Sequence, residues 1–496
     1  MPGEVTETAR AGGGVSDVVA LAAGAAPALR AASREVRAGW LRGVADALDA
    51  EADALVEIAD RETHLGAERL RGEVARTTGQ LRLFAGVIEE GSYLEAIVDA
   101  ADPAAVPPRP ELRRLLRPLG TVAVFSASNF PFAFSVAGGD TAAALAAGCP
   151  VVVKGHSGHP ELSRATARVV TDALAAAGAP AGTFGLVEGR QAGLDLVRAP
   201  AVRAAAFTGS LAGAQGLMDE IARRPDPIPF FGELGSTNPV VVTPGAIAAR
   251  GDAILDGLVA SFTLGGGQFC TKPGLVFVPR GVADDPRLRE RVAERPEFTL
   301  LTDRIAAAFA PGVDRLREEG AARVVAGQAS AASGPVRAVV VATDIGTFLE
   351  RSDALLEECF GPVTVLVEYD EVDEVVTALA RVGGSLTGTL HAQPGEAIDE
   401  VVAALEERVG RVVFDGWPTG VAVTWSQHHG GPWPATTNTS TSVGATSIRR
   451  FLRPVAYQQA PAAALPADLR DEALAGIPHR RNGELVLPSP NRGTTP

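Results

Sequence analysis

The segment TVAVFSASNFPFAFSVAGGDTAAALAAGCPVVVKGHSGHP, residues 121–160, decides how the first half of the chain folds. It begins with an apolar run at 121–128, passes through a loop into the alanine-rich stretch 140–149, and ends in a second apolar run at 150–156. Short apolar runs bounded by turn residues are typical of buried strands, and the stretch between them favours a helix. We therefore predict a βαβ unit with two parallel strands.

The same alternation continues on both sides of this unit. Upstream, residues 29–90 place apolar and charged residues at helical spacing, which predicts several amphipathic helices in an outer layer. Downstream we expect a helix over 161–177, a strand over 183–187, a helix near Gly193 and a strand over 203–210. This order predicts an α/β fold whose first domain is of the Rossmann type, a parallel sheet with helices on both faces.

A chain of 496 residues exceeds what one hydrophobic core normally organises, so we expect a second domain, beginning near Gly232. Its strands are predicted in VRAVVVAT (336–343), GPVTVLVEY (361–369) and GRVVFDG (410–416), separated by helices. Beyond Pro461 the chain is rich in Ala, Pro and Arg, which is typical of a tail.

Composition excludes several classes of protein. A formal charge of −14 argues against nucleic acid or an anionic membrane as the main partner. The apolar stretch 120–153 is broken by polar residues and prolines, so it does not read as a membrane span. Three cysteines are too few for a disulfide framework, and the N-terminus has no basic and apolar export signal; we expect a cytoplasmic protein.

Two segments suggest acyl chemistry when they are taken together. In GGGQFCTKPG (265–274), small residues around Cys270 leave room for a ligand, although a free cysteine is as often a buried apolar residue. In FGELGSTNP (231–239), Glu233 ends an apolar strand, where a carboxylate is costly unless it is paired or useful. Beside a thiol, this carboxylate could activate water to attack a thioester.

Other candidates are weaker as single residues. Asn129 directly follows a buried strand, where it could donate to an oxyanion or simply form a turn. Lys154 ends the next strand and is either a solvated lysine or a cation that reaches a nucleotide. The turn FTGSLAG (207–213) could face a phosphate, and Glu358 in EECFGPV could bind ribose hydroxyls or cap a helix in solvent.

Six segments in this order resemble the aldehyde dehydrogenase superfamily: NFPF, ALAAGCPVVVK, FTGS, ELGSTNP, GQFCTKPG and EECFGPV. The resemblance extends from about Leu29 to Tyr457. It implies a nucleotide-binding domain (1–109 and 121–231), a catalytic domain (232–430) and a β-flap for oligomerisation (110–120 and 440–458), followed by a C-terminal tail (461–496). The flap implies a homodimer or homotetramer.

The resemblance also implies roles for individual residues. Cys270 attacks an aldehyde, Asn129 and the Cys270 backbone amide stabilise the oxyanion, hydride leaves to a nicotinamide, and Glu233 activates the water that releases a carboxylic acid. The residues expected around the cofactor are Lys154, His156, Ser157, Arg190, Phe207, Thr208, Gly209, Ser210, Gly213, Glu358 and Phe360.

The segment KGHS departs from many NAD-using members, which carry a carboxylate three residues after the lysine. Here that position is Ser157, so a 2′-phosphate would meet no negative charge, and Lys154, His156 and Arg190 could supply positive or donor groups. We expect NADP⁺ to be preferred over NAD⁺, with NAD⁺ still possible.

Three longer segments, 132–160, 232–246 and 428–458, resemble the α-ketoglutaric semialdehyde (2,5-dioxovalerate) dehydrogenase branch. This implies oxidation of 2,5-dioxopentanoate to 2-oxoglutarate. Similar sequences include NADP-dependent fatty aldehyde dehydrogenases, so a fatty aldehyde or another semialdehyde is an alternative substrate. A CoA-acylating dehydrogenase or thioester hydrolase is a second enzymatic interpretation, and an inactive nucleotide-binding scaffold is an interpretation from another class.

Two further groups of residues have open roles. Arg449, Arg450 and Arg453 could pair with a substrate carboxylate or serve the flap. His428 and His429 resemble metal ligands, but no third ligand stands at a suitable spacing in the sequence, so we expect no metal site.

Overall fold

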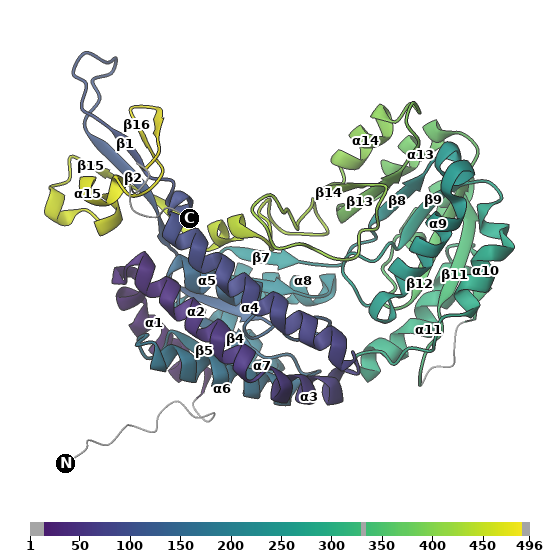
Figure 1. Ribbon diagram of the computed structural model, residues 1–496, viewed down its shortest axis with the longest axis horizontal. Coiled ribbons are helices and arrows are strands. Elements are labelled where there is room, and N and C mark those ends of the chain that lie inside the picture. The colour runs from purple at the N-terminus through teal and green to yellow at the C-terminus, as the bar shows by residue number, and fades with distance from the viewer. Residues whose placement is uncertain (1–13, 329–333, 489–496) are drawn as a thin grey trace, which may run out of the picture.

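The computed structural model describes residues 14–328 and 334–488 and contains three β-sheets (Figure 1). Residues 1–13 of the predicted nucleotide-binding domain and 489–496 of the predicted tail lie outside the described residues. Two of the sheets form the centres of two lobes, and the third projects away from the first lobe. The predicted α/β class is confirmed.

The first sheet has five parallel strands in the order β5-β4-β3-β6-β7. Its strands are β3 (Thr121–Phe125), β4 (Val151–Lys154), β5 (Phe184–Val187), β6 (Val202–Thr208) and β7 (Phe230–Glu233). The predicted βαβ unit is β3, α5 and β4, and β3 and β4 pair in parallel as expected. All five strands end at the same edge, and the strand order reverses between β3 and β6, which is where open α/β sheets bind ligands.

Helices cover both faces of this sheet. They are α1 (Val15–Ala31), α2 (Arg34–Ala50), α3 (Ala52–Thr63), α4 (Ala67–Glu90), α5 (Gly139–Ala147), α6 (Pro160–Ala176), α7 (Arg190–Arg198) and α8 (Leu211–Ala222). Apolar residues of α2, α4, α5 and α6 form one core with β3 and β4, and those of α7 and α8, with part of α1, form another. The helices predicted over 29–90 and 161–177 are therefore present, and they bury their apolar faces.

The second sheet has seven strands in the order β10-β11-β12-β9-β8-β13-β14, all parallel except β10 at the edge. The strands are β8 (Pro239–Val242), β9 (Leu275–Pro279), β10 (Arg323–Gly327), β11 (Val339–Asp344), β12 (Val363–Tyr369), β13 (Ser385–His391) and β14 (Val409–Phe414). The helices of this lobe are α9 (Pro244–Thr263), α10 (Pro286–Ala293), α11 (Asp303–Glu318), α12 (Ile345–Leu355), α13 (Val372–Leu379) and α14 (Asp399–Glu406). The three strands predicted for the second domain are β11, β12 and β14.

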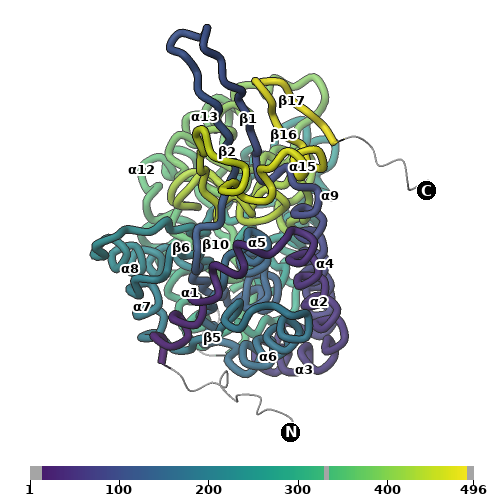
Figure 2. The backbone as a smooth tube through the Cα atoms, turned by 90° about the vertical axis from the view of Figure 1, so that its left-hand side faces the viewer, coloured from purple at the N-terminus to yellow at the C-terminus, as the bar shows by residue number. Residues whose placement is uncertain are grey.

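The third sheet, in the order β15-β2-β1-β16-β17, is larger than the flap expected from the sequence. Its strands are β1 (Ile97–Asp99), β2 (Leu112–Pro118), β15 (Leu452–Gln458), β16 (His479–Arg481) and β17 (Glu484–Val486). Thus β1 comes from a segment assigned to the nucleotide-binding domain, and β16 and β17 come from the predicted tail. Figures 1 and 2 show this sheet projecting beyond the helices. Because β16 forms by pairing with β1 through backbone hydrogen bonds, the composition of the tail alone did not reveal this strand.

A long segment, 415–444, runs between the two lobes without a helix or strand in its described residues. Thr436 forms a β-bridge with Glu233 of the first sheet, and the carbonyl of Trp433 accepts a hydrogen bond from the Gly384 amide just before β13. It leads into the short helix η4 (Ala445–Phe451). This segment, which we call the bridging segment, brings side chains to the space between the two sheets.

Among the described helices, none combines the length and the apolar character that crossing a membrane requires.

Candidate active site

A run of three glycines places Cys270 between the lobes. Gly265, Gly266 and Gly267 follow α9 and have φ values of 57°, 67° and 69°, which L-residues with side chains rarely adopt. A Cβ on Gly267 would lie 2.2 Å from the carbonyl oxygen of Gly361, so the chain can pass here only as glycine. The side-chain amide of Asn238 then holds the turn at Cys270 by donating to the Cys270 carbonyl at 2.8 Å.

Glu233 ends β7 and is almost completely buried, with 3% of its surface exposed. Its Oε1 lies 2.8 Å from Nε2 of His429, and its Oε2 accepts a hydrogen bond from the Ser442 hydroxyl. Both partners come from the bridging segment. The costly burial of this carboxylate is therefore offset by two partners.

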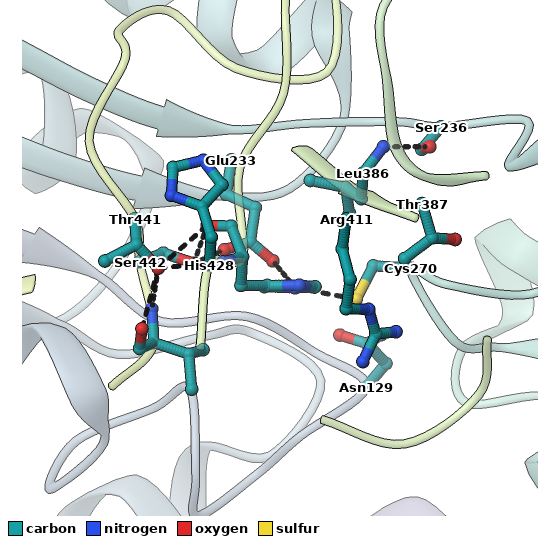
Figure 3. Close-up of polar contacts among 12 residues, drawn as sticks. Asn129, Glu233, Ser236, Cys270, Leu386, Thr387, Arg411, His428, Thr441 and Ser442 are labelled. Carbon is teal, nitrogen blue, oxygen red and sulfur yellow. Dashed lines mark hydrogen bonds and ion pairs between the residues drawn. The ribbon is translucent and has the colours of Figure 1, made fainter. Parts of the chain in front are cut away.

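His429 joins the carboxylate to the thiol. Its Nε2 lies 3.6 Å from Sγ of Cys270, and one ligand atom from each of Cys270, Glu233 and His429 lies within 4.8 Å of the others. The His429 backbone is held in turn, since its amide donates to Thr441 Oγ1 at 2.8 Å and its carbonyl accepts from the Ser442 amide at 2.8 Å. Figure 3 shows Glu233, Cys270 and Ser442 converging on this space.

Burial and charge set the protonation of this cluster. Burial raises the pKa of the Cys270 thiol, the negative charge of Glu233 raises it further, and the positive charge of Arg76 opposes both. Burial alone would also raise the pKa of Glu233, but the charge and hydrogen bond of His429 and the Ser442 hydroxyl outweigh it, so this pKa is lowered. The cluster thus holds a carboxylate next to a thiol that is reluctant to ionise.

Asn129 lies in the loop after β3 and faces the same space (Figure 3). One N–H of its side chain donates to the carbonyl of Gln268 at 2.9 Å, two residues before the thiol. An amide nitrogen has two hydrogens, so the second can serve a ligand. The loop is held by α4, where Arg69 donates to the Asn129 carbonyl at 2.7 Å and Glu73 accepts from the Phe132 amide at 2.8 Å.

The turn after β6 forms a cradle at the edge of the first sheet. Ser210 caps α8 by accepting from the Gly213 amide at 3.2 Å, which leaves other amides at the helix N-terminus without intrahelical partners. A Cβ on Gly209 would lie 2.7 Å from the Phe207 ring, and one on Gly213 would lie 3.0 Å from it. Thr208, at the end of β6, is half-buried. A pyrophosphate fits this arrangement of small residues and free amides.

Lys154 ends β4 at the same edge. Burial lowers the pKa of its ammonium group, and no carboxylate of the described residues lies within 4.0 Å of it. Ser157, between β4 and α6, and Arg190, the first residue of α7, are both exposed. A negatively charged ligand would thus find a cation without a competing partner.

His156 supplies no positive charge, contrary to one of the two options expected from the sequence. Burial, with the nearby His159, lowers the pKa of His156 to about 3, and its Nδ1 accepts from the Gly158 amide at 3.0 Å. Its Nε2–H remains a possible donor.

Glu358 and Phe360 lie on the other lobe, ahead of β12, and both are half-buried. Burial raises the pKa of Glu358, whose carboxylate faces the loop after Glu233; a Cβ on Gly235 would lie 2.4 Å from Oε2. The adjacent backbone is fixed by Lys272, which donates to the carbonyls of Cys359 and Gly361 at 2.7 and 3.0 Å. Glu358 therefore faces the catalytic segment and is no solvated helix end.

The model of the aldehyde dehydrogenase family matches residues 4–452. The chain belongs to this family.

The most similar relatives of this aldehyde dehydrogenase include two bacterial enzymes. It is 45% identical over 475 residues to alpha-ketoglutaric semialdehyde dehydrogenase 2 of Azospirillum brasilense, covering 94% of this chain and 90% of that protein. It is 40% identical over 462 residues to alpha-ketoglutaric semialdehyde dehydrogenase of Acinetobacter baylyi, covering 92% and 88%. Its fold matches that of aldehyde dehydrogenase 21 from Physcomitrella patens with a TM-score of 0.77 and 21% identity, over 91% of both chains.

Sequence reasoning missed two residues of this aldehyde dehydrogenase's candidate site, His429 and Ser442. The sequence predicts no metal site at this histidine, because no third ligand stands at a suitable spacing, and it leaves open whether the histidine touches the substrate. The fold brings Glu233 and Cys270 to it from 196 and 159 residues away. The only signal in the sequence is a pair of histidines followed by two glycines in HHGGP (428–432), and spacing alone cannot identify partners so far along the chain.

Two of the three arginines at 449–453 of the aldehyde dehydrogenase form ion pairs within the protein. Arg450 is buried and forms an ion pair with Asp140 at 2.6 Å. Arg449 pairs with Glu95 at 3.0 Å, and Arg453 is exposed on β15. Two of the three thus have protein carboxylates as partners, which favours the structural alternative.

Proposed function

We propose that this aldehyde dehydrogenase oxidises 2,5-dioxopentanoate to 2-oxoglutarate, with Cys270 as the nucleophile. The observation that carries the chemistry is the cluster of Cys270, His429 and Glu233, in which a buried thiol, imidazole and carboxylate lie within 4.8 Å of one another. The names of the two bacterial relatives support the substrate.

In the first step Cys270 attacks the aldehyde carbon. His429 assists, because the Nε2–H that faces Glu233 also faces the sulfur and can donate to a thiolate there. The thiol proton leaves to solvent, and the carbonyl oxygen becomes an oxyanion. The free N–H of Asn129 and the backbone amide of Cys270 are suited to donate to this oxygen.

NAD(P)⁺, when bound, supplies the acceptor for the hydride that leaves the thiohemiacetal carbon. The chain's own residues must then hydrolyse the thioester on Cys270. Glu233 takes a proton from water, the resulting hydroxide attacks the acyl carbon, and the Cys270 sulfur leaves as the acid is released. The lowered pKa of Glu233 keeps this base ionised at neutral pH.

We further propose that NADP⁺ is preferred. Lys154 and the Ser210 turn would hold the cofactor's phosphates, Glu358 its nicotinamide ribose, and Phe360 would pack near the nicotinamide. Ser157 places no carboxylate against a 2′-phosphate, while Lys154, exposed Arg190 and the Nε2–H of His156 offer donors.

The projecting third sheet is proposed to join subunits into a homodimer or homotetramer. Its strands stand clear of the first lobe, and Val106 between β1 and β2 is 99% exposed in one chain. Such a projecting apolar tip is suited to burial against a second copy.

The test is initial-rate formation of NADPH and NADH with 2,5-dioxopentanoate, succinate semialdehyde and hexanal. The proposal predicts the highest kcat/KM with 2,5-dioxopentanoate and NADP⁺. A preference for hexanal would favour the fatty aldehyde alternative, and inactivity with every aldehyde and both cofactors would favour the scaffold.

A further inference from the structure

One face of α4 carries three charged residues next to the loop after β3, which contains Asn129. Arg69, Glu73 and Arg76 are spaced by four and three residues, so they lie on one side of the helix. Arg69 donates to the Asn129 carbonyl and lies 4.8 Å from the Phe269 ring, and Glu73 accepts from two backbone amides. These two residues are therefore engaged in holding the loop.

Arg76 differs from its two neighbours. Its guanidinium carbon lies 5.7 Å from the ring centre of Phe130 and 5.3 Å from that of Phe134, and its buried Nε has no hydrogen-bond partner. Within residues 14–328 and 334–488, Arg76 makes no side-chain hydrogen bond and no ion pair within 4.0 Å. Two aromatic rings thus hold a cation whose N–H groups have no hydrogen-bond acceptor among the described residues.

This cation faces the candidate active site. Phe134, over which Arg76 lies, is 6.2 Å from the His429 ring, and the charge of Arg76 acts on Glu73, Cys270 and Glu233. Glu73 is the other charged group facing it, but its Oε1 already accepts from the loop amides at 2.8 and 3.0 Å. The buried Oε2 of Glu73 has no hydrogen-bond partner, but it makes no ion pair with Arg76 within 4.0 Å among the described residues, so the N–H groups of Arg76 are open to a ligand.

A second cation, Arg411 on β14, also acts on Cys270 and lies beside it in Figure 3. Its two terminal nitrogens donate to the carbonyls of Gly420 and Pro418 at 3.1 and 2.6 Å. These contacts tie Arg411 to the bridging segment. Arg76 is thus the better candidate for a ligand.

We propose that Arg76 binds the carboxylate of the substrate while its aldehyde lies at Cys270, and that this contact selects short oxo acids over uncharged aldehydes. The inference rests on the proposed function and deepens it by naming a specificity-determining residue. A guanidinium can take a carboxylate with two parallel hydrogen bonds, and a site already shielded by two aromatic rings strengthens them. In 2,5-dioxopentanoate four bonds separate the carboxylate carbon from the aldehyde carbon, and Arg76 is near enough to Cys270 for its charge to act on the thiol.

A different role would leave another signature. If Arg76 served only to favour the Cys270 thiolate, its loss would slow all aldehydes alike. The decisive quantity is therefore the ratio of kcat/KM for a charged and an uncharged aldehyde of similar length, 2,5-dioxopentanoate and pentanal.

The experiment compares the wild type with Arg76→Gln, Arg76→Lys and Arg411→Gln. Arg71→Gln is the matched control, because it removes the same charge from an exposed position of α4. We expect Arg76→Gln to raise KM for 2,5-dioxopentanoate about tenfold to a hundredfold, with pentanal changed by less than about threefold. Arg76→Lys should restore part of the loss, and Arg71→Gln should match the wild type.

A second readout needs neither turnover nor cofactor. Cys270 is alkylated with iodoacetate and with iodoacetamide, and the adducts are counted by mass spectrometry. In Arg76→Gln, the ratio of the alkylation rate with iodoacetate to that with iodoacetamide should fall below the wild-type ratio. If wild type oxidises no aldehyde, the proposed function fails while this ratio still tests Arg76.

Three results would overturn the inference: an equal loss for both substrates and both reagents in Arg76→Gln, no loss for either, or a loss of charge selectivity in Arg411→Gln in place of Arg76→Gln. Circular dichroism of each variant shows whether a loss reflects folding, and Arg76→Lys keeps the test open if Arg76→Gln does not fold.

Discussion

His429 Nε2 lies 2.8 Å from Oε1 of Glu233, and this contact joins the bridging segment to the last residue of β7. The pair ties the protonation of Glu233 to the presence of the histidine. Burial raises the pKa of Glu233, and the charge and hydrogen bond of His429 are the largest effects that bring it down. Removing the imidazole leaves burial as the dominant effect.

His429→Phe should therefore raise the pKa of Glu233. A general base works as the carboxylate, so activity falls as pH drops through its pKa, and the acidic limb of the pH profile should move to higher pH in the variant. We expect kcat at neutral pH to fall about tenfold to a hundredfold. His428→Phe, the neighbouring histidine, is the control, and an unmoved acidic limb in His429→Phe would contradict the account.

Ser157→Glu should change the choice of cofactor. A carboxylate at this exposed position would repel a 2′-phosphate and could bind ribose hydroxyls, so kcat/KM for NADP⁺ should fall by about tenfold or more while that for NAD⁺ rises. Ser157→Ala adds no charge and should keep the wild-type ratio. The measurement is initial rates with both cofactors; a wild type about tenfold more efficient with NAD⁺ would refute the preference.

Zinc should inhibit the enzyme reversibly. Cys270, His429 and Glu233 are ligand types for Zn²⁺, and the 3.6 Å between Sγ and Nε2 suits two corners of a tetrahedral site. We expect micromolar Zn²⁺ to block activity, EDTA to restore it, and His429→Phe to weaken the inhibition. EDTA alone should leave the untreated enzyme active, since catalysis as proposed uses no metal; loss of activity with EDTA would contradict this.

Gly267→Ala should destabilise the protein and disturb Cys270. The added Cβ would lie 2.2 Å from the Gly361 carbonyl oxygen, and the residue would keep a φ of 69°. We expect a loss of about 1–3 kcal/mol in the free energy of unfolding. Gly216→Ala, in α8 where no atom lies within 4 Å of the added Cβ, is the control for denaturant melts.

The sequence was sufficient for the parts of the fold that are set by local pattern. Residues 121–160 form β3, α5 and β4. Their apolar strands and alanine-rich helix follow local preference, and the same residues are the ones that pack in the core. Only two of the five strands of the third sheet, β2 and β15, lie in the segments expected for the flap. The strands β1, β16 and β17 have three residues each, too few for a local pattern to reveal them.

The candidate site divides in the same way. Cys270, Glu233 and Asn129 stand in recognisable motifs, and the fold brings all three to one space. His429 and Ser442 reach that space through a segment with neither helix nor strand, and no periodicity reports where such a segment goes. Arg76 was hidden for another reason, because in an amphipathic helix a charged residue is normally read as solvent-facing.

The most direct test of the central claim is to trap the acyl group on Cys270. In Glu233→Gln, hydrolysis should be slow while the earlier steps proceed, so mixing with 2,5-dioxopentanoate and NADP⁺ should give a rapid burst of about one NADPH per subunit. Peptide mass spectrometry should then find the acyl group on Cys270 and on neither Cys149 nor Cys359, both of which are buried. A burst that persists in a Glu233→Gln, Cys270→Ala double variant, or an acyl group on another residue, would contradict the thioester mechanism.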